Sequence, residues 1–180
     1  MRNFRIYFTF LLTVALTFTA CKPNKEKELQ KIKELEARIL GDQPGNIDGV
    51  GAYNLQTAYT GFYQNFPDAE ETPELIFKAA DMCVNLRWSK QAIDFLNIII
   101  NEYPKFAKAP DALFMLAFVY DHLVDDDAKA GELYRAFIDQ YPDHVFVRDA
   151  EASIRILGKS DEEIIREFEQ RQMEDSTTKI

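Results

Sequence analysis

Residues 110–142 read PDALFMLAFVYDHLVDDDAKAGELYRAFIDQYP, and this stretch decides the fold. In each half of it, apolar residues recur every three or four positions. They are Leu113, Leu116, Ala117 and Tyr120 in the first half, and Ala130, Tyr134, Phe137, Ile138 and Tyr141 in the second. This spacing places apolar residues on one face of a helix. Two such helices joined by a short acidic turn predict an antiparallel hairpin.

The pattern of this hairpin recurs along the chain. Aromatic–proline pairs stand at residues 66–67, 103–104 and 141–142, so that successive pairs are 37 and 38 residues apart. Residues of the same type align between them: Phe77 with Phe114, Ala80 with Ala117, Ala92 with Ala130, Leu96 with Tyr134, and Ile100 with Ile138. Ser89 aligns with Asp127, and both residue types accept hydrogen bonds at a helix start. A fixed period of this size predicts a solenoid of stacked hairpins.

Each hairpin has a small residue in its first helix, here called helix A, and another in its second helix, helix B. These small residues are Ala80 and Ala117 in helix A, and Ala92 and Ala130 in helix B. An aromatic residue follows Ala117 by one turn at Tyr120, although Cys83 departs from the pattern. A large apolar residue and a closing proline complete the set. Over residues 52–157 the pattern resembles the tetratricopeptide repeat, which implies an all-α solenoid that binds other proteins.

The tetratricopeptide period is typically ~34 residues. We therefore expect the extra residues to lengthen the loop after each proline. Longer linkers such as YPKFAKAPDAL, residues 103–113, resemble the envelope branch of the family. That branch includes the lipoprotein of the β-barrel assembly (Bam) complex and the periplasmic cell-division coordinator.

The first twenty residues read as a targeting signal. Arg2 and Arg5 form a positive region, residues 6–18 an apolar stretch, and Thr19-Ala20 a small-residue cleavage site. This apolar run is shorter than the ~20 residues that span a bilayer. The sequence FTAC, ending at Cys21, resembles a bacterial lipobox, although Phe18 departs from it. The resemblance implies an acylated Cys21, and Lys22 after it favours the outer membrane.

Residues 21–46 are expected to form a lipid-anchored tether with a short helix. Leu29, Ile32, Leu35 and Ile39 form a narrow apolar seam under two heptads long. The seam either packs on the first hairpin, which we favour, or joins two copies in a short coiled coil. With Cys21 acylated, Cys83 has no partner for a disulfide within the chain, and we expect it in the core beside Ile76 and Ala80.

The solenoid is predicted to span residues 47–158, beginning with a truncated repeat whose helix B ends near Phe66. Thr72 is a candidate N-cap, and Pro73 fits a first helical turn. Gly158 should end the last helix A. The capping box of residues 160–163 predicts a C-terminal capping helix at 159–174, ending near Met173. Residues 175–180 are expected to be a frayed tail.

Charge and composition exclude several function classes. Removal of Arg2 and Arg5 with the signal leaves 19 basic against 30 acidic residues, a net charge of −11. Nucleic-acid binding requires cations that neutralise phosphates, so it is not expected. The run Asp125-Asp126-Asp127 lacks the glycine and distant glutamate of a calcium loop, so no metal site is predicted.

Catalysis has little support in the sequence. The two histidines, His122 and His144, belong to no recognisable catalytic motif, and no phosphate-binding glycine loop occurs. We expect no catalytic residue, no cofactor and no enzymatic activity.

The resemblance implies a partner-binding concave surface formed by the A helices. Its candidate residues are Phe77, Asp81, Val84, Phe114, Phe118, Asp121 and His122. Phe114 and Phe118 either anchor a partner segment or pack against the next helix A, and the sequence leaves both alternatives open.

The sequence thus predicts an all-α, lipid-anchored tetratricopeptide-like solenoid that faces the periplasm from the bacterial outer membrane and holds other proteins. The leading functional hypothesis is an accessory role in outer-membrane protein assembly. The alternative is a self-associating adaptor in cell division or cell-wall organisation. A monomer is slightly favoured.

Overall fold

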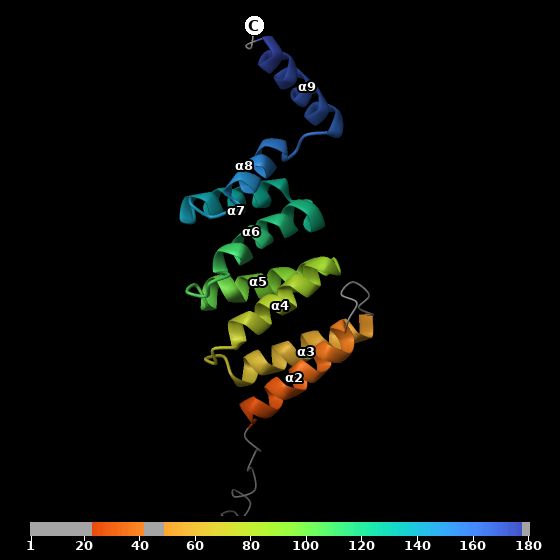
Figure 1. Cartoon of the computed structure of the whole chain (residues 1–180), viewed down its shortest axis with the longest axis vertical. Coiled ribbons are helices and arrows are strands. Elements are labelled where there is room, and N and C mark those ends of the chain that lie inside the picture. The colour runs from red at the N-terminus through yellow and green to blue at the C-terminus, as the bar shows by residue number, and fades with distance from the viewer. Residues whose placement is uncertain (1–22, 42–48, 178–180) are drawn as a thin grey trace, which may run out of the picture.

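The computed structural model describes residues 23–41 and 49–177, which form an all-α stack. No strand occurs in these ranges, which confirms the all-helical fold for them. The eight α-helices are α2 (Lys25–Leu40), α3 (Gly49–Asn65), α4 (Thr72–Asn85), α5 (Ser89–Glu102), α6 (Ala109–Val119), α7 (Asp127–Gln140), α8 (Val147–Ile156) and α9 (Asp161–Thr177). Figure 1 shows them stacked along one axis, with α2 at one end and α9 at the other. The expected signal and Cys21 lie outside the described residues.

The helices pack chiefly against their neighbours in sequence, and α4 with α5 and α6 with α7 form the two complete hairpins. The four alanines predicted at the closest approach are fully buried, since Ala80, Ala92, Ala117 and Ala130 each have 0% exposure. Cys83 is also buried in this core, and its burial raises the pKa of the thiol to about 12. The predicted core role of Cys83 is confirmed.

The three linkers that follow helix B share one conformation and one length. They comprise residues 66–71, 103–108 and 141–146. In each, the amide of the fourth residue donates to the carbonyl of the first, and the first helical amide donates to the carbonyl of that fourth residue. The donor–acceptor pairs are Ala69–Phe66 and Thr72–Ala69, Phe106–Tyr103 and Ala109–Phe106, and His144–Tyr141 and Val147–His144, at 2.9 to 3.1 Å. The three aromatic–proline sites are therefore structurally equivalent, as their spacing predicted.

The two complete hairpins differ by one residue within helix A. The amide of Trp88 donates to the carbonyl of Cys83 at 2.8 Å, five residues back, whereas the amide of Asp126 donates to Tyr120 at 2.9 Å, six residues back. Residues 120–124 form a π-helical turn that holds the additional residue. This insertion explains why the spacing of aligned residues changes from 37 to 38 between helix A and helix B.

Both A helices end in a left-handed residue that is not glycine. Arg87 has φ 58° and Asp125 has φ 63°. These positions are equivalent in the two hairpins, because each stands two residues before helix B. The left-handed residue reverses the chain into the turn between the paired helices.

The predicted N-caps are wrong by one residue. Thr72 is the first residue of α4, and its hydroxyl donates to the carbonyl of Phe66 at 2.6 Å instead of accepting from an amide. Ser89 and Asp127 likewise open α5 and α7, one position inside the helix. The N-cap of α7 is Asp126, whose carboxylate accepts from the amide of Lys129 at 2.9 Å. The N-cap residue lies outside the helix, and for α5 and α7 it directly follows the left-handed residue.

We expect Asp126→Ala to reduce the free energy of unfolding by about 1 kcal/mol, because it removes the hydrogen bond that caps α7. Ser89→Ala is the matched control, since no side-chain bond caps α5, and its effect should stay within about 0.5 kcal/mol. Urea titration followed by circular dichroism measures both. Equal losses would contradict the assignment of the cap to Asp126.

Helix α2 packs on α3, as favoured from the sequence. Ile32 is only 3% exposed, and Leu29, Leu35 and Ile39 pack against the same core. The hydroxyl of Tyr59 donates a hydrogen bond to Glu36 at 2.8 Å. The pKa of Tyr59 is raised, mainly because the hydroxyl is buried and also because of this bond. An ion pair of 3.0 Å between Lys25 and Glu71 joins α2 to the linker before α4. The apolar seam of α2 is therefore occupied within the chain.

The C-terminal region departs further from expectation. Gly158, with φ 71°, follows α8 as predicted, and the capping box is confirmed, since the amide of Ser160 donates to Glu163 at 2.9 Å. However, α9 continues to Thr177, four residues past the expected end. It extends away from α7 and α8 (Figure 1), and an ion pair of 2.7 Å links Lys159 to Glu167. None of the described helices is long and apolar enough to cross a bilayer.

Candidate functional site

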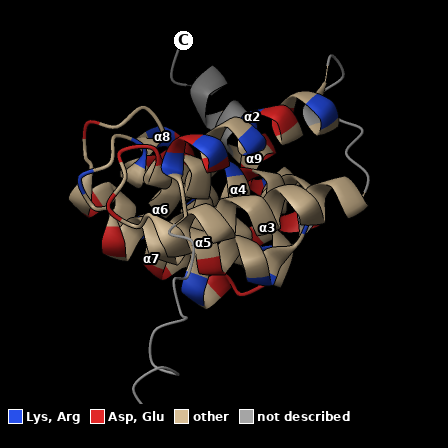
Figure 2. Cartoon of the chain, turned by 90° about the horizontal axis from the view of Figure 1, so that it is seen from below, with Lys and Arg blue, Asp and Glu red and all other residues tan. Residues whose placement is uncertain are grey.

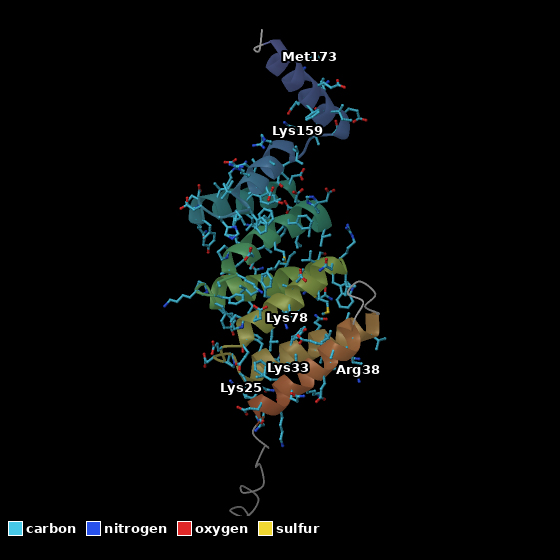
Figure 3. The ribbon with its side chains drawn as sticks, in the orientation of Figure 1. Lys25, Lys33, Arg38, Lys78, Lys159 and Met173 are labelled. Carbon is cyan, nitrogen blue, oxygen red and sulfur yellow. The ribbon has the colours of Figure 1, made fainter. Side chains whose placement is uncertain are left out.

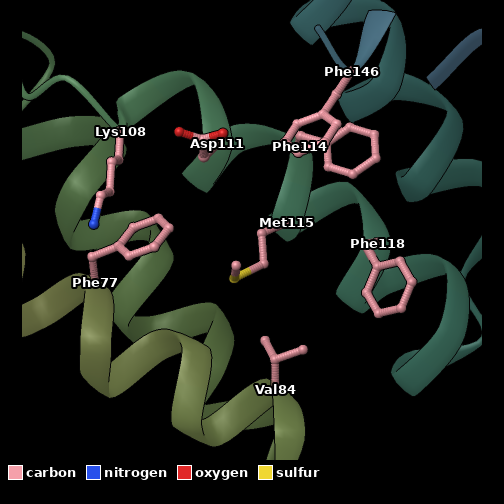
Figure 4. Close-up of a pocket in the computed structure, with 8 residues that line it drawn as sticks. All are labelled: Phe77, Val84, Lys108, Asp111, Phe114, Met115, Phe118 and Phe146. Carbon is pink, nitrogen blue, oxygen red and sulfur yellow. The ribbon is translucent and has the colours of Figure 1, made fainter. Parts of the chain in front are cut away.

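An apolar groove follows the A helices of the two complete hairpins. It lies between α4 and α6 and reaches the linker before α8, with a volume of about 470 Å³. Figure 4 shows the side chains around it. They are Phe77, Val84, Lys108, Asp111, Phe114, Met115, Phe118 and Phe146. Six of the eight are apolar, so the groove suits apolar side chains of a ligand.

Helix spacing places these residues on one surface. Phe77 and Val84 are seven residues apart on α4 and therefore lie on the same face, two turns apart. Phe114 and Phe118 are one turn apart on α6, with Met115 beside them. Because α4 and α6 are equivalent helices of consecutive hairpins, their exposed faces meet along one side of the stack.

Phe114 belongs both to the groove and to the core. Its ring stacks on Phe146 with centroids 4.9 Å apart and an interplanar angle of 22°. Its other contacts are with Tyr134 at 5.6 Å and Phe137 at 5.5 Å, both buried in the second hairpin. Phe114 therefore lines the groove while it packs on α7 of its own hairpin and on the linker before α8.

Phe118 has fewer ring contacts than Phe114, so it is the groove residue that can be changed with less effect on the core. Its ring stacks on His122 at 4.3 Å, with an interplanar angle of 20°, and it is partly buried. His122 lies on the π turn, where its Nδ1 is 3.2 Å from the Asp121 carboxylate. The π turn thus places the imidazole of His122 against Phe118, although His122 itself does not line the groove.

Charged groups mark the end of the groove near the linkers. The Lys108 ammonium lies 2.8 Å from Glu74 and 5.0 Å from the centre of the Phe77 ring, as a cation–π contact. Asp111 lies 3.7 Å from Nε2 of His144. Because these charged groups are paired with each other, a ligand gains most by covering the apolar side chains of the groove and removing them from water.

Four of the seven candidate residues line this groove, namely Phe77, Val84, Phe114 and Phe118. Asp81 is exposed on α4 but does not line the groove. Asp121 accepts a hydrogen bond from the hydroxyl of Tyr134 at 3.2 Å, which makes it a support of the hairpin. Burial, aided by nearby Asp121, raises the pKa of Tyr134 to about 12.

The remaining lining residues were missed in the sequence. They are Lys108, Asp111, Met115 and Phe146. Lys108 and Phe146 each immediately precede a helix A, so they are equivalent linker positions. The 38-residue period already indicates that equivalence, but it does not show that linker side chains form walls of the groove. No group of three or more potential metal ligands occurs within residues 23–41 and 49–177.

Residues 111–144 match the family model of the tetratricopeptide repeat. This match covers most of α6, the π turn, α7 and the start of the next linker. It confirms a tetratricopeptide repeat at the hairpin that first indicated the fold. No curated protein matches the chain. The repeat indicates an adaptor for protein–protein interaction.

Proposed function

We propose that this chain is a lipid-anchored adaptor of the bacterial envelope, which binds a segment of a partner protein in the groove between α4 and α6. The groove itself is the observation that carries the proposal. It places three partly exposed phenylalanines, Phe77, Phe114 and Phe118, with Met115 in one concave surface. Aromatic side chains in desolvated pockets dominate the energy of protein interfaces.

The shape of the groove favours a narrow ligand over a flat one. Its volume of about 470 Å³ accommodates a few side chains, and it runs along the stack across two hairpins. A helix or an extended strand of a partner can place its alternate apolar residues against Phe77 at one end and Phe118 at the other. A short segment is therefore the proposed ligand.

The envelope location rests on the residues before α2. Arg2 and Arg5, the apolar run at 6–18 and the sequence ending at Cys21 support export and acylation. More than one acyl chain gives stable anchoring, because each buried methylene contributes about 0.8 kcal/mol. Lys22 supports the outer membrane, and an accessory role in outer-membrane protein assembly is the finer form of the proposal.

The proposed role is not enzymatic. His122 stacks on Phe118, and His144 contacts the ring of Phe137 edge-on at 5.3 Å, so packing accounts for both imidazoles. In the proposal, they shape the groove and its rim. A hydrolytic activity that disappears on changing either histidine to alanine would contradict this part of the proposal.

Removing one groove ring should weaken capture of the partner. We expect Phe118→Ala to reduce recovery of the bound protein at least tenfold, since interface hot spots contribute about 2 kcal/mol or more. The measurement is crosslinking of the anchored protein in its own cells, followed by pull-down and quantitative mass spectrometry. Phe118 is preferred over Phe114, whose loss would also disturb the core.

Val145→Ala is the matched control for this experiment. Val145 is 78% exposed in the linker beside Phe146 but does not line the groove. It removes apolar surface without changing the proposed contact. Recovery of the same proteins in equal amounts by Phe118→Ala, Val145→Ala and the unchanged chain would rule out the groove as the binding site.

The anchor predicts an equally direct result. We expect Cys21→Ser to move the protein from the membrane fraction to the soluble fraction, because the acyl chains would have no thiol to carry them. Cys83→Ala, which changes the other cysteine, should leave the protein at the membrane. Sedimentation of membranes after a salt wash measures both. Persistence of the Cys21→Ser protein in the pellet would refute acyl anchoring.

A further inference from the structure

The two ends of the stack expose large apolar side chains. At the C-terminal end, Ile165 and Phe168 on α9 are 58% and 61% exposed. They are three residues apart and therefore share one face of the helix. At the N-terminal end, Val50 and Tyr53 on α3 are 71% and 63% exposed. A solenoid normally needs polar terminal faces to remain soluble as a single unit, so this pattern at both ends requires an explanation.

A second groove lies between α2 and α3, at the end of the stack opposite to α9. Its volume is about 410 Å³, and it includes Ile32 and Leu35 on α2 with Ala58 and Gly61 on α3. A Cβ atom added at Gly61 would meet no atom within 4 Å, so the groove is open at that point. Small residues at its floor allow the backbone of another helix to approach closely.

The α3 wall of this groove carries no charge. No acidic or basic residue occurs between Gly49 and Asn65, in a chain in which 28% of residues are charged. Figure 2, which looks onto this end of the stack, shows α3 without coloured residues. Thr57 and Gly61 line this wall one turn apart, and Tyr53 lies one turn before them in the adjoining pocket. An apolar helix face can therefore bury against it without stripping water from ions.

The α2 wall is basic on its exposed side. Lys27, Lys31, Glu34 and Arg38 are exposed along one stripe of α2 at helical spacing, with three basic residues and one acidic one. Lys31 of this stripe lines the groove, next to Glu28. Two other acids of α2 are engaged within the chain, since Glu28 accepts from Asn65 and Glu36 accepts from Tyr59 and Lys78. Lys33 and Arg38 of α2 are labelled in Figure 3. Lys27 and Lys31 are two further exposed cations of this helix.

The opposite charge occurs on α9. Its 17 residues include seven acidic and two basic ones, a net charge of −5. Glu162 and Glu169 are exposed and border the face that carries Ile165, because they precede and follow it by three and four residues. An acidic helix with an apolar stripe is therefore complementary to a groove with an uncharged α3 wall and a net basic stripe of α2 beside it.

We propose that α9 of one copy of this chain lies in the α2–α3 groove of a second copy. The lengths agree, because 17 residues of α9 and 16 residues of α2 both span about 25 Å. Phe168 and Ile165 meet the open floor at Ala58 and Gly61, while Glu162 and Glu169 face Lys31 and its basic neighbours. This contact differs from a coiled coil through the seam of α2, which packs on α3.

The proposed contact joins opposite ends of the molecule. Each copy thus keeps one unused groove and one unused α9, and association continues as a head-to-tail series or closes into a ring. It differs from the monomer favoured by the sequence. It is also independent of the groove between α4 and α6, so the two proposals stand or fall separately.

Sedimentation velocity of the full chain carrying Cys21→Ser, without acyl chains, tests the contact. The unchanged α9 and groove should give species larger than a monomer, and their proportion should increase with protein concentration and decrease with salt. Phe168→Glu on α9 and Gly61→Trp in the groove should each give a monomer. Phe168 is 61% exposed, and a side chain at Gly61 would meet no atom within 4 Å. At concentrations where the parent chain is monomeric, the melting temperatures of both variants should therefore equal that of the parent chain.

Mixing the two variants distinguishes this contact from a symmetric one. The Phe168→Glu chain retains its groove, and the Gly61→Trp chain retains its α9, so one productive pair can form. We expect a one-to-one complex of twice the monomer mass that does not grow further. A parent chain that remains monomeric at 100-fold the concentration of the first run would overturn the proposal. So would a Gly61→Trp chain that assembles like the parent, because α9 would then bind elsewhere.

Discussion

Ala117→Trp should lower the melting temperature by about 6 to 12 °C. Ala117 is fully buried, and it belongs to the cluster in which α6 packs on α7 through Ala130, Leu113 and Tyr134. An indole at this position cannot fit without separating the paired helices, which we expect to cost about 3 kcal/mol or more. In a domain of this size each kcal/mol shifts the melting temperature by about 2 to 4 °C. Scanning calorimetry or thermal circular dichroism measures the shift.

Ala128→Trp is the matched control for this change. Ala128 is exposed in the first turn of α7, so the same side chain can extend into solvent there. Its effect on the melting temperature should be within about 2 °C, as for most surface substitutions. A similar drop in melting temperature for both variants would mean that tryptophan destabilises the helix itself. The close approach of α6 and α7 would then not be what limits the size of residue 117.

Phe137→Ala is expected to lower the free energy of unfolding by about 3 to 5 kcal/mol. Phe137 has 0% exposure, and its ring contacts Phe114 at 5.5 Å, Tyr141 at 5.9 Å and His144 at 5.3 Å. Its removal leaves a cavity that joins the second hairpin to the linker before α8. Urea denaturation should show a lower midpoint of unfolding, because the lost contacts join α6, α7 and the linker before α8.

Phe168→Ala makes the same chemical change on a residue that is 61% exposed. It should leave the free energy of unfolding within about 0.5 kcal/mol of the parent chain. The comparison separates the cavity from any general loss of aromatic area. A Phe137→Ala protein as stable as the Phe168→Ala protein would contradict the placement of Phe137 at the centre of the second core cluster.

Repeated residues allowed much of the fold to be predicted from the sequence. Ala80, Ala92, Ala117 and Ala130 are identical in type and are all fully buried, because close helix approach tolerates only small side chains. The spacing of the aromatic–proline pairs likewise predicted three equivalent linkers. Features that every repeat shares are visible as periodicity in the sequence. They can therefore be predicted without knowing how distant parts of the chain are arranged.

The π turn shows what periodicity alone does not explain. The spacing of 37 residues from Phe77 to Phe114 and of 38 from Ala92 to Ala130 already indicates one inserted residue. Either a longer turn or a bulge within the helix can absorb it, and the choice depends on hydrogen bonds such as that from Asp126 to Tyr120. The N-caps were misplaced for the same reason, since turn conformation decides which residue leaves the helix.

The candidate groove was predicted in part. Helical spacing identified Phe77, Val84, Phe114 and Phe118, because residues on one helix face share a surface. Phe146 was missed, since its contact with Phe114 joins two hairpins and depends on the linker conformation. The position of α9 was also not predictable, because a capping box fixes where a helix begins but not the direction in which it extends.

The identical linkers have a consequence for how the chain folds. Since each places the next helix directly beside the previous one, all extensive helix contacts join segments that are adjacent in sequence. The ends of only short loops must be brought together, so little entropy is lost before native contacts form. Assembly can therefore begin at either hairpin and spread to both sides, and stability adds up locally, one helix interface at a time.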